Sequence, residues 1–210
     1  MLGERGMWFK MSFLEHSARI PLVIAGPGVA QGADDTLCSL IDLLPTLTDI
    51  GGGVDRYAQP IGGRSIWPAC QGNSFEGEVI GEYCAECAGA PVFMIRRGDL
   101  KYIHCDLDPP QLFDLAADPQ EVRNVAADPA YAEAAAAFAA EVLERWDPAA
   151  IKAEVIASQQ SRQQLHEMMD TTGDNAWDYN PPRDASNEYV RNHHDWVATA
   201  TRARFPPLKS

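Results

Sequence analysis

The sequence has little positive charge and no long apolar run. Its 17 lysine and arginine residues face 30 aspartate and glutamate residues, which gives a formal net charge of −13. Nucleic acid and anionic membrane surfaces repel a chain of this sign, so we expect neither as a partner. No stretch of about 18 or more apolar residues is present, so we expect no membrane span. The acidity serves solubility and would also suit a cationic substrate.

Cysteine is also scarce. The five cysteines lack the spacing of a disulfide framework, and the first residues carry charges rather than the apolar core of a signal peptide. We therefore expect reduced thiols and a cytoplasmic location. Cys84 and Cys87 form a C-x-x-C pair in a strand-like segment, whereas a redox pair lies at a helix N-terminus. A zinc site would need more soft ligands, for which His104 and Cys105 are weak candidates. We interpret the pair as coincidental and expect no metal site in this chain.

The first 56 residues have the pattern of an α/β domain. A polar, Gly-rich loop leads into an apolar run at residues 20–25, which predicts a buried strand. Apolar residues spaced as on one helical face follow at 40–50, and three glycines end this helix. Pro45 should kink the helix or mark a new start. Because a strand followed by a helix is typical of parallel sheets, we expect residues 1–56 to be the last βα unit of a larger α/β domain.

The following residues, 57–146, predict a small antiparallel sheet and a packing helix. Turn-forming residues come first, and runs of β-branched and aromatic residues then predict strands at 78–84, 92–97, 100–105 and 111–115. Asp128-Pro129 and Asp147-Pro148 each join an N-cap acceptor to a proline at the first helical position. They predict one helix from residue 129 and another at 148–170. The fold class is therefore α/β, and α+β within this chain, and we expect residues 147–210 to form a helix and an extended tail.

Two segments resemble a known family. The first contains Lys10, Phe13, Glu15 and Arg19-Ile20-Pro21, and ends in Gly26-Pro27-Gly28. The second contains Leu112-Phe113-Asp114-Leu115, Asp118-Pro119, Glu121 and Asn124-Val125-Ala126. Both resemble the sulfatase family, in which they occur in this order. Further segments are similar to the choline sulfatases, a branch of this family: Gly81-Glu82-Tyr83, Ala85-Glu86, Ala90-Pro91, Trp177-Asp178-Tyr179 and Tyr189-Val190-Arg191-Asn192-His193.

The resemblance implies a sulfuric-ester hydrolase of the alkaline phosphatase superfamily, with choline sulfate as its substrate. Sulfatases use a formylglycine, made from Cys or Ser in a C/S-x-P-x-R motif, and a divalent metal, Ca²⁺ or Mg²⁺. None of the five cysteines lies in that motif, and the D-(H/N)-G segment that supplies metal ligands is absent from the sequence. We therefore expect this chain to be the C-terminal part of such an enzyme and to be inactive by itself.

Lys10 is the predicted catalytic and substrate-binding residue. The matching lysine of the family contacts the sulfate group, where a fixed ammonium stabilises developing charge. Glu86 is also predicted to bind substrate, because a quaternary ammonium has no N–H and is recognised by aromatic faces and a nearby carboxylate. Glu15 and Arg19 lie four residues apart and predict an ion pair with a structural role. His16 has no positioned partner for acid–base chemistry.

The tail, residues 171–210, is irregular yet contains several aromatic residues, which are rare in disordered tails. By resemblance, we expect it to be an oligomerisation arm that forms a homodimer or homotetramer, with subunit contacts from Asn192, His193 and Asp195. Two alternatives stay open. The chain could belong to another sulfatase or a phosphonate monoester hydrolase, or it could be a non-catalytic assembly module.

Overall fold

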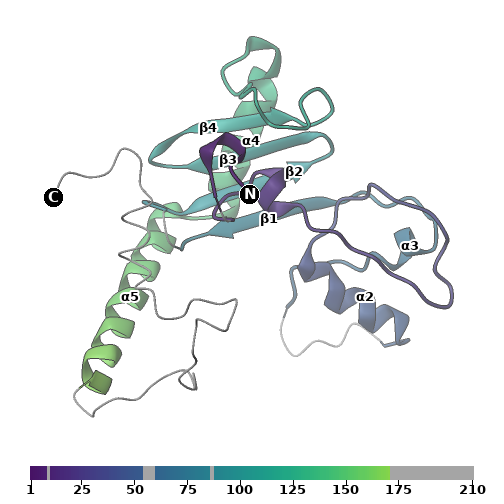
Figure 1. The fold of residues 1–210 in the computed structure, drawn as a ribbon, viewed down its shortest axis with the longest axis horizontal. Coiled ribbons are helices and arrows are strands. Elements are labelled where there is room, and N and C mark those ends of the chain that lie inside the picture. The colour runs from purple at the N-terminus through teal and green to yellow at the C-terminus, as the bar shows by residue number, and fades with distance from the viewer. Residues whose placement is uncertain (9, 54–59, 86–87, 171–210) are drawn as a thin grey trace, which may run out of the picture. The chain divides into compact units, whose positions relative to one another are not determined.

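The computed structural model describes residues 1–8, 10–53, 60–85 and 88–170 (Figure 1). The chain divides into two units, residues 1–159 and 160–210. In the second unit, the described residues are 160–170, which form the end of helix α5 (Pro148–Asp170). Among the helices of the described residues, none is both long enough and apolar enough to cross a bilayer.

The first unit is built on a four-stranded antiparallel sheet, which confirms the predicted small sheet. The strands lie in sequence order, and their bounds are β1 (Glu78–Tyr83), β2 (Val92–Arg97), β3 (Leu100–Cys105) and β4 (Asp108–Asp114). Gly98, with φ +54°, lies in the turn that joins β2 to β3. β4 begins before its predicted start and includes Pro109 and Pro110. Prolines are tolerated there because β4 is an edge strand, which pairs only with β3 among the described strands.

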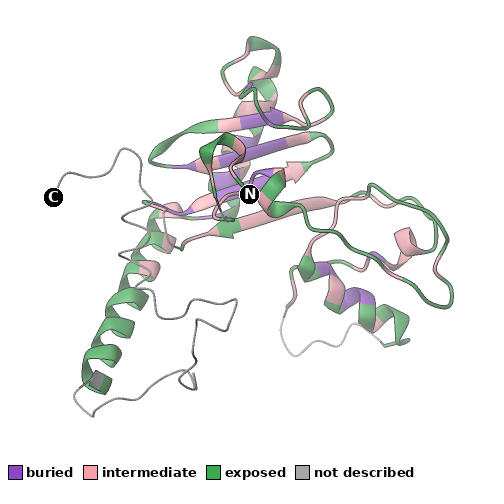
Figure 2. Ribbon diagram, in the orientation of Figure 1, coloured by how far each residue is buried: buried purple, intermediate pink, exposed green. Residues whose placement is uncertain are grey.

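Each face of the sheet carries its own core, because side chains alternate between the two faces of a strand. Figure 2 marks the buried residues along the ribbon drawn in Figure 1. On one face, helix α4 (Ala132–Arg145) packs against the strands, and Tyr102 stacks on Phe138 with ring centroids 5.8 Å apart. On the other face, the N-terminal segment supplies Leu14 to a smaller core. The first core comprises Phe93, Ile95, Tyr102, Leu112, Val125, Phe138, Val142 and Trp146, and the second Leu14, Met94, Ile103 and Phe113.

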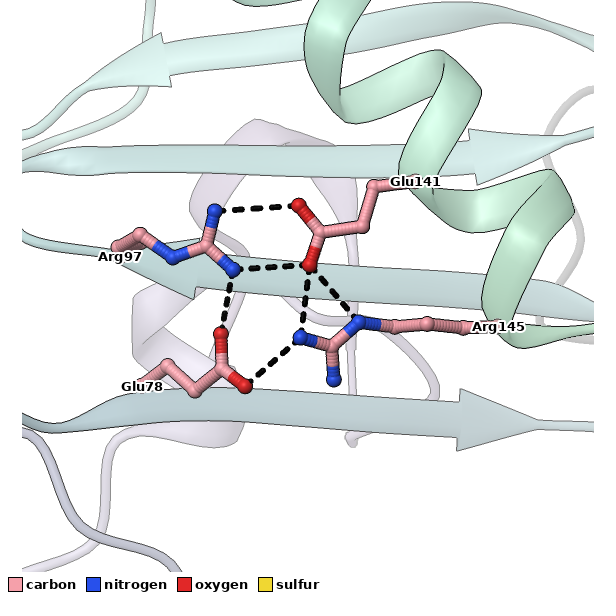
Figure 3. A network of polar contacts seen from close by, with 4 residues as sticks. All are labelled: Glu78, Arg97, Glu141 and Arg145. Carbon is pink, nitrogen blue, oxygen red and sulfur yellow. Dashed lines mark hydrogen bonds and ion pairs between the residues drawn. The ribbon is translucent and has the colours of Figure 1, made fainter.

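Ion pairs also hold α4 on its face of the sheet (Figure 3). Arg97 of β2 lies 2.6 Å from Glu78 of β1 and 2.8 Å from Glu141 of α4. Arg145 of α4 lies 2.8 Å from Glu78 and 2.7 Å from Glu141, so each charge contacts two of opposite sign. We call Glu78, Arg97, Glu141 and Arg145 the helix-face ion network.

The two long helices begin where the Asp-Pro pairs predict. The Asp128 carboxylate accepts a hydrogen bond from the backbone N–H of Ala130 and caps the turn η3 (Pro129–Tyr131), which continues into α4. In the same way, Asp147 accepts from the N–H of Ala150 at 2.9 Å. α5 covers the predicted residues 148–170, so both helix predictions are confirmed.

The predicted buried strand at residues 20–25 is wrong for this structure. These residues adopt no strand, and Val23 is 88% exposed. Their backbone groups make no hydrogen bond with any other described residue. A buried strand needs neighbouring strands to pair its N–H and C=O groups, and none of the described segments supplies them. The other N-terminal elements are short: η1 (Glu4–Gly6), α1 (Glu15–Ala18), η2 (Leu40–Asp42), α2 (Leu43–Ile50) and α3 (Trp67–Cys70).

Helix α2 confirms the predicted helix, and its apolar face is largely exposed. It starts afresh at Leu43 after η2, which puts Pro45 in its first turn, where a missing N–H costs nothing. It is held by polar contacts, because Asp42 accepts from the N–H of Arg64 at 2.8 Å and Thr46 from that of Ile66 at 3.0 Å. The exposed apolar side chains are Leu40, Ile41, Leu44, Leu47 and Ile50.

Candidate functional site

Lys10 lies in an exposed loop whose backbone is fixed. Its carbonyl oxygen accepts two hydrogen bonds, from the N–H of Ser12 at 2.8 Å and from the Ser17 hydroxyl at 2.5 Å. Its side chain is exposed and forms no ion pair with any residue that the structure describes. The structure therefore combines an ordered backbone with an ammonium group that remains available to an anion.

Two apolar residues hold this loop against the sheet. Leu14 is buried in the smaller core. The Phe13 ring lies on β1 at Gly81, where an added Cβ would come within 2.5 Å of ring carbon Cε1. Gly81 therefore leaves the space that lets Phe13 pack directly on the strand.

Four charged residues near Phe13 attach the loop to the sheet. Lys101 of β3 is only 1% exposed, and its Nζ lies 2.6 Å from a carboxylate oxygen of Glu15 and 2.6 Å from one of Glu121. Its Nζ also donates to the Phe13 carbonyl at 2.8 Å. Arg96 of β2 donates to both oxygens of Glu15, at 3.1 and 2.9 Å. We call Glu15, Arg96, Lys101 and Glu121 the buried ion cluster, and its two positive and two negative charges balance.

Glu121 reaches this cluster from a strained backbone. Its φ of +54° is uncommon for a residue other than glycine and costs about 1–2 kcal/mol. The side chain is 1% exposed, and Oε2 accepts from the N–H of Glu15, the first residue of α1, at 2.6 Å. The Lys101 contact to the other oxygen, Oε1, is an ion pair without hydrogen-bond geometry. Such strain persists only where the surrounding contacts hold it.

Glu15 is ionised more readily than an ordinary glutamate. Burial acts to raise its pKa, but the hydrogen bond from Lys101 and the charges of Lys101 and Arg96 outweigh burial and lower the pKa. The predicted partner Arg19 has only a weaker electrostatic effect. The structural role that we predicted for Glu15 is therefore confirmed. Its ion pairs are with Arg96 and Lys101 of the sheet rather than with the predicted partner Arg19.

The second resembling segment fixes the chain after β4. Asn124 accepts from the N–H groups of Leu112 and Ala126 and donates to the Pro110 carbonyl at 3.0 Å. Asp114 accepts from the Tyr131 hydroxyl at 2.7 Å, and this hydrogen bond lowers its pKa. Since Glu121 belongs to the same segment, both resembling segments meet at Lys101.

The structure places only part of the predicted site. Lys10 is described, whereas Glu86 and the tail residues Asn192, His193 and Asp195 lie outside the described residues. His16 is exposed. Sequence reasoning missed Arg96 and Lys101. The available signal was that Lys101 lies two residues before Ile103 and therefore on the same face of the strand predicted at residues 100–105.

The described residues do not fit a metal or a formylglycine. They contain no group of three or more His, Cys, Asp or Glu side chains that could hold a metal ion. Cys84 is a poor nucleophile, because burial, and then the charge of Glu82, raises its pKa. Its predicted C-x-x-C partner, Cys87, lies outside the described residues, and His104 is paired with Asp106 at 3.1 Å. We therefore assign no chemical step to a metal or formylglycine within this chain.

Comparison with known proteins identifies the family. A family model described as "N-sulphoglucosamine sulphohydrolase, C-terminal" matches residues 3–147, and one described as "Choline sulfatase enzyme C terminal" matches residues 153–205. The chain belongs to the sulfatase family, and it matches the C-terminal part of these enzymes.

Individual relatives agree with this assignment. The chain is 42% identical to the choline-sulfatase of Rhizobium meliloti (strain 1021), over 98% of this chain and 41% of that protein. It is 34% identical to the arylsulfatase K of Homo sapiens, over 55% of this chain and 24% of that protein. A crystal structure of a candidate sulfatase from Bacteroides thetaiotaomicron is 30% identical with a TM-score of 0.56, and covers 64% of this chain and 32% of that one. The chain thus spans about two fifths, or less, of the length of these relatives.

Proposed function

We propose that this chain is the C-terminal part of a sulfuric-ester hydrolase that converts choline sulfate to choline and sulfate. The observation that carries the proposal is the 42% identity to a choline-sulfatase over 98% of the chain. The match of residues 153–205 to the choline sulfatase C-terminal model supports the same substrate.

Lys10 is the residue that we assign to the sulfate group. Its backbone is held by two hydrogen bonds while its ammonium is free of ion pairs with the described residues. A preorganised positive charge stabilises the charge that develops on sulfate oxygens as the ester bond breaks, without reorganisation during the reaction. Glu86 is assigned to the choline ammonium by resemblance and by the chemistry of quaternary ammonium ions.

The remaining catalytic groups belong to residues outside this chain. The sequence has no C/S-x-P-x-R motif, and its described residues contain no metal-binding group. We therefore propose that the formylglycine and the Ca²⁺ or Mg²⁺ of such an enzyme are held by other residues, and that the 210-residue chain alone does not hydrolyse sulfate esters.

The predicted organisation also stays a proposal. We assign residues 1–56 to the end of a large α/β domain, 57–146 to a C-terminal subdomain, and 147–210 to a helix and an oligomerisation arm that builds a dimer or tetramer. The unpaired backbone at 20–25 and the outward apolar face of α2 support the first assignment, because both would pack in a larger sheet domain. The free thiols of Cys38, Cys70, Cys84 and Cys105 support a cytoplasmic location.

A chimera tests the function. This chain replaces the corresponding C-terminal part of the Rhizobium meliloti choline-sulfatase, and hydrolysis of choline sulfate is compared with that of 4-nitrophenyl sulfate. We expect preference for choline sulfate, and Lys10→Ala should lower kcat/KM by about 10²–10³, as when one charge-stabilising donor is removed. Lys152→Ala, which removes another exposed lysine, is the matched control and should have no effect. A chimera that folds, binds its metal and prefers the aryl ester would contradict the choline assignment.

A different sulfatase is the second candidate. The similarity to arylsulfatase K over 55% of the chain favours it. The family model that matches residues 3–147, which include Lys10 and the sheet, is also described for a sulfatase other than choline sulfatase. A panel of aryl, carbohydrate and choline sulfates, together with a phosphonate monoester, separates these substrates in the same chimera. If the chimera hydrolyses none of them but associates through residues 171–210, the non-catalytic assembly role is the better account.

A further inference from the structure

The buried ion cluster lies directly under the loop that carries Lys10. We propose that Lys101 and Glu121 are positioning residues: they fix α1, and α1 in turn fixes the backbone of Lys10. The inference rests on the proposed role of Lys10, although its structural part can be tested without any activity.

The first step is the attachment of α1 to the sheet. Lys101 donates to the Phe13 carbonyl, and Glu121 accepts from the Glu15 N–H, so both backbone contacts lie at the start of α1. Lys101 also contacts the carboxylates of Glu15 and Glu121 at 2.6 Å. An apolar replacement of this cluster would fill the same space, but it would offer no directed contact to these two backbone groups. The cluster therefore fixes where α1 begins.

The second step leads from α1 to Lys10. Ser17, in the middle of α1, donates its hydroxyl hydrogen to the Lys10 carbonyl at 2.5 Å. The Ser12 N–H donates to the same oxygen. A shift of α1 would break the Ser17 bond and leave the Lys10 carbonyl held by the Ser12 N–H alone. We therefore infer that the intact cluster is needed to hold the Lys10 ammonium in one position.

Limited trypsin digestion of the full 210-residue chain measures this directly. Trypsin cuts after Lys10 and after Arg19, and both side chains are exposed. The Lys10 carbonyl accepts two hydrogen bonds, while that of Arg19 accepts none from the described residues. In the unmodified chain we therefore expect slower cleavage at Lys10–Met11 than at Arg19–Ile20. The ratio of the two rates reports how often the loop opens, because cleavage follows the open population when closing is fast.

Glu121→Gln keeps an oxygen that can accept from Glu15 but removes the charge facing Lys101. We expect cleavage at Lys10–Met11 to rise about tenfold or more, because the buried Lys101 ammonium loses one of its two negative partners, with little change at Arg19–Ile20. Ser17→Ala, which leaves the cluster intact, should raise it less. Glu141→Gln, in the helix-face ion network, is the matched control and should leave the ratio unchanged.

A second variant keeps the test interpretable if Glu121→Gln fails to fold. Lys101→Met with Glu121→Gln removes one charge of each sign, so no uncompensated buried charge remains. The bond after Arg96, inside β2, must stay uncut, since its cleavage would report global unfolding. If both cluster variants keep this bond intact and leave the Lys10–Met11 ratio unchanged, the inference is overturned.

Activity of the chimera gives the second readout. If Glu121 acts through Lys10, the double variant Lys10→Ala with Glu121→Gln loses no more kcat/KM than Lys10→Ala alone, because effects of residues that act as a unit do not multiply. Multiplied losses would show that Glu121 acts by another route and would overturn the inference. If cleavage at Lys10–Met11 rises while Lys10→Ala keeps full activity, the positioning of the loop stands and the proposed function of Lys10 fails.

Discussion

Arg96 and Arg97 are neighbours in β2, yet they serve opposite faces of the sheet in different ways. Arg96 joins the buried ion cluster under the N-terminal segment, where Lys101 and Glu121 are each 1% exposed. Arg97 joins the helix-face ion network, where its own side chain is 49% exposed (Figure 3). Both sets contain two positive and two negative charges. They differ in how much water reaches them.

The segments that cover the two faces of the sheet, α4 on one and the N-terminal segment on the other, explain this difference. α4 brings a large apolar core of its own, including Phe138 and Val142, so the network beside it adds little to what already holds the helix. Among its described residues, the N-terminal segment brings only Leu14 as a buried residue. On that face, polar and charged contacts must specify where the segment lies, and they do so where water cannot compete.

The largest expected effect follows from breaking the buried cluster at its centre. Lys101→Met leaves Glu121 buried without its positive partner, so we expect the free energy of unfolding to fall by about 3–5 kcal/mol. Urea denaturation followed by circular dichroism measures this change. An effect below about 1 kcal/mol would place Lys101 among surface ion pairs and remove the contrast between the faces.

A change at Gly81 sharpens the comparison, because it disturbs the packing of the N-terminal segment and leaves α4 in place. Gly81→Ala places a methyl group within 2.5 Å of the Phe13 ring, so we expect a loss of about 1–3 kcal/mol from overpacking. Hydrogen exchange should increase in residues 10–18 and stay unchanged in α4. Phe13→Leu in the same chain should restore part of the loss, and no recovery would show that the strain lies elsewhere.

Acidification tests the same face of the sheet with a smaller expected effect, because it removes the charge of Glu15 without changing the sequence. The pKa of Glu15 is lower in the folded chain than in the unfolded one, so its ionised form stabilises the fold above the ordinary glutamate pKa of about 4.3. This stabilisation is lost as the pH falls through the lowered pKa of the folded state. Unfolding midpoints measured between neutral and acid pH should therefore decline less steeply for Glu15→Gln than for the unmodified chain. Equal slopes would contradict the ionised, paired state of Glu15.

The smallest effect is expected in the helix-face ion network. Glu141→Gln should lower the free energy of unfolding by about 0.2–1 kcal/mol, because its partners are partly exposed. Added salt should reduce the difference further, since it screens exposed charges. A loss as large as that of Lys101→Met would mean that exposure does not separate the two sets.

Local signals in the sequence predicted much of the fold. β2 and β3 have their predicted bounds because a turn at Gly98 joins two runs rich in β-branched and aromatic residues, and α5 begins at its Asp-Pro cap. The exposure of residues 20–25 was not predictable, because burial of a strand depends on neighbours that lie elsewhere in sequence. The pairing of Lys101 with Glu15 and Glu121 was missed for the same reason. Lys10 was found only through resemblance, since an exposed lysine has no local signature.

The close packing of Phe13 on Gly81 also limits how this sequence can change over generations. A side chain at position 81 becomes acceptable only once position 13 carries something smaller than phenylalanine, whereas a smaller residue at 13 merely leaves a gap. The two substitutions therefore have a preferred historical order, with position 13 changing first. Among diverging relatives, these positions should vary together although they lie 68 positions apart in the sequence.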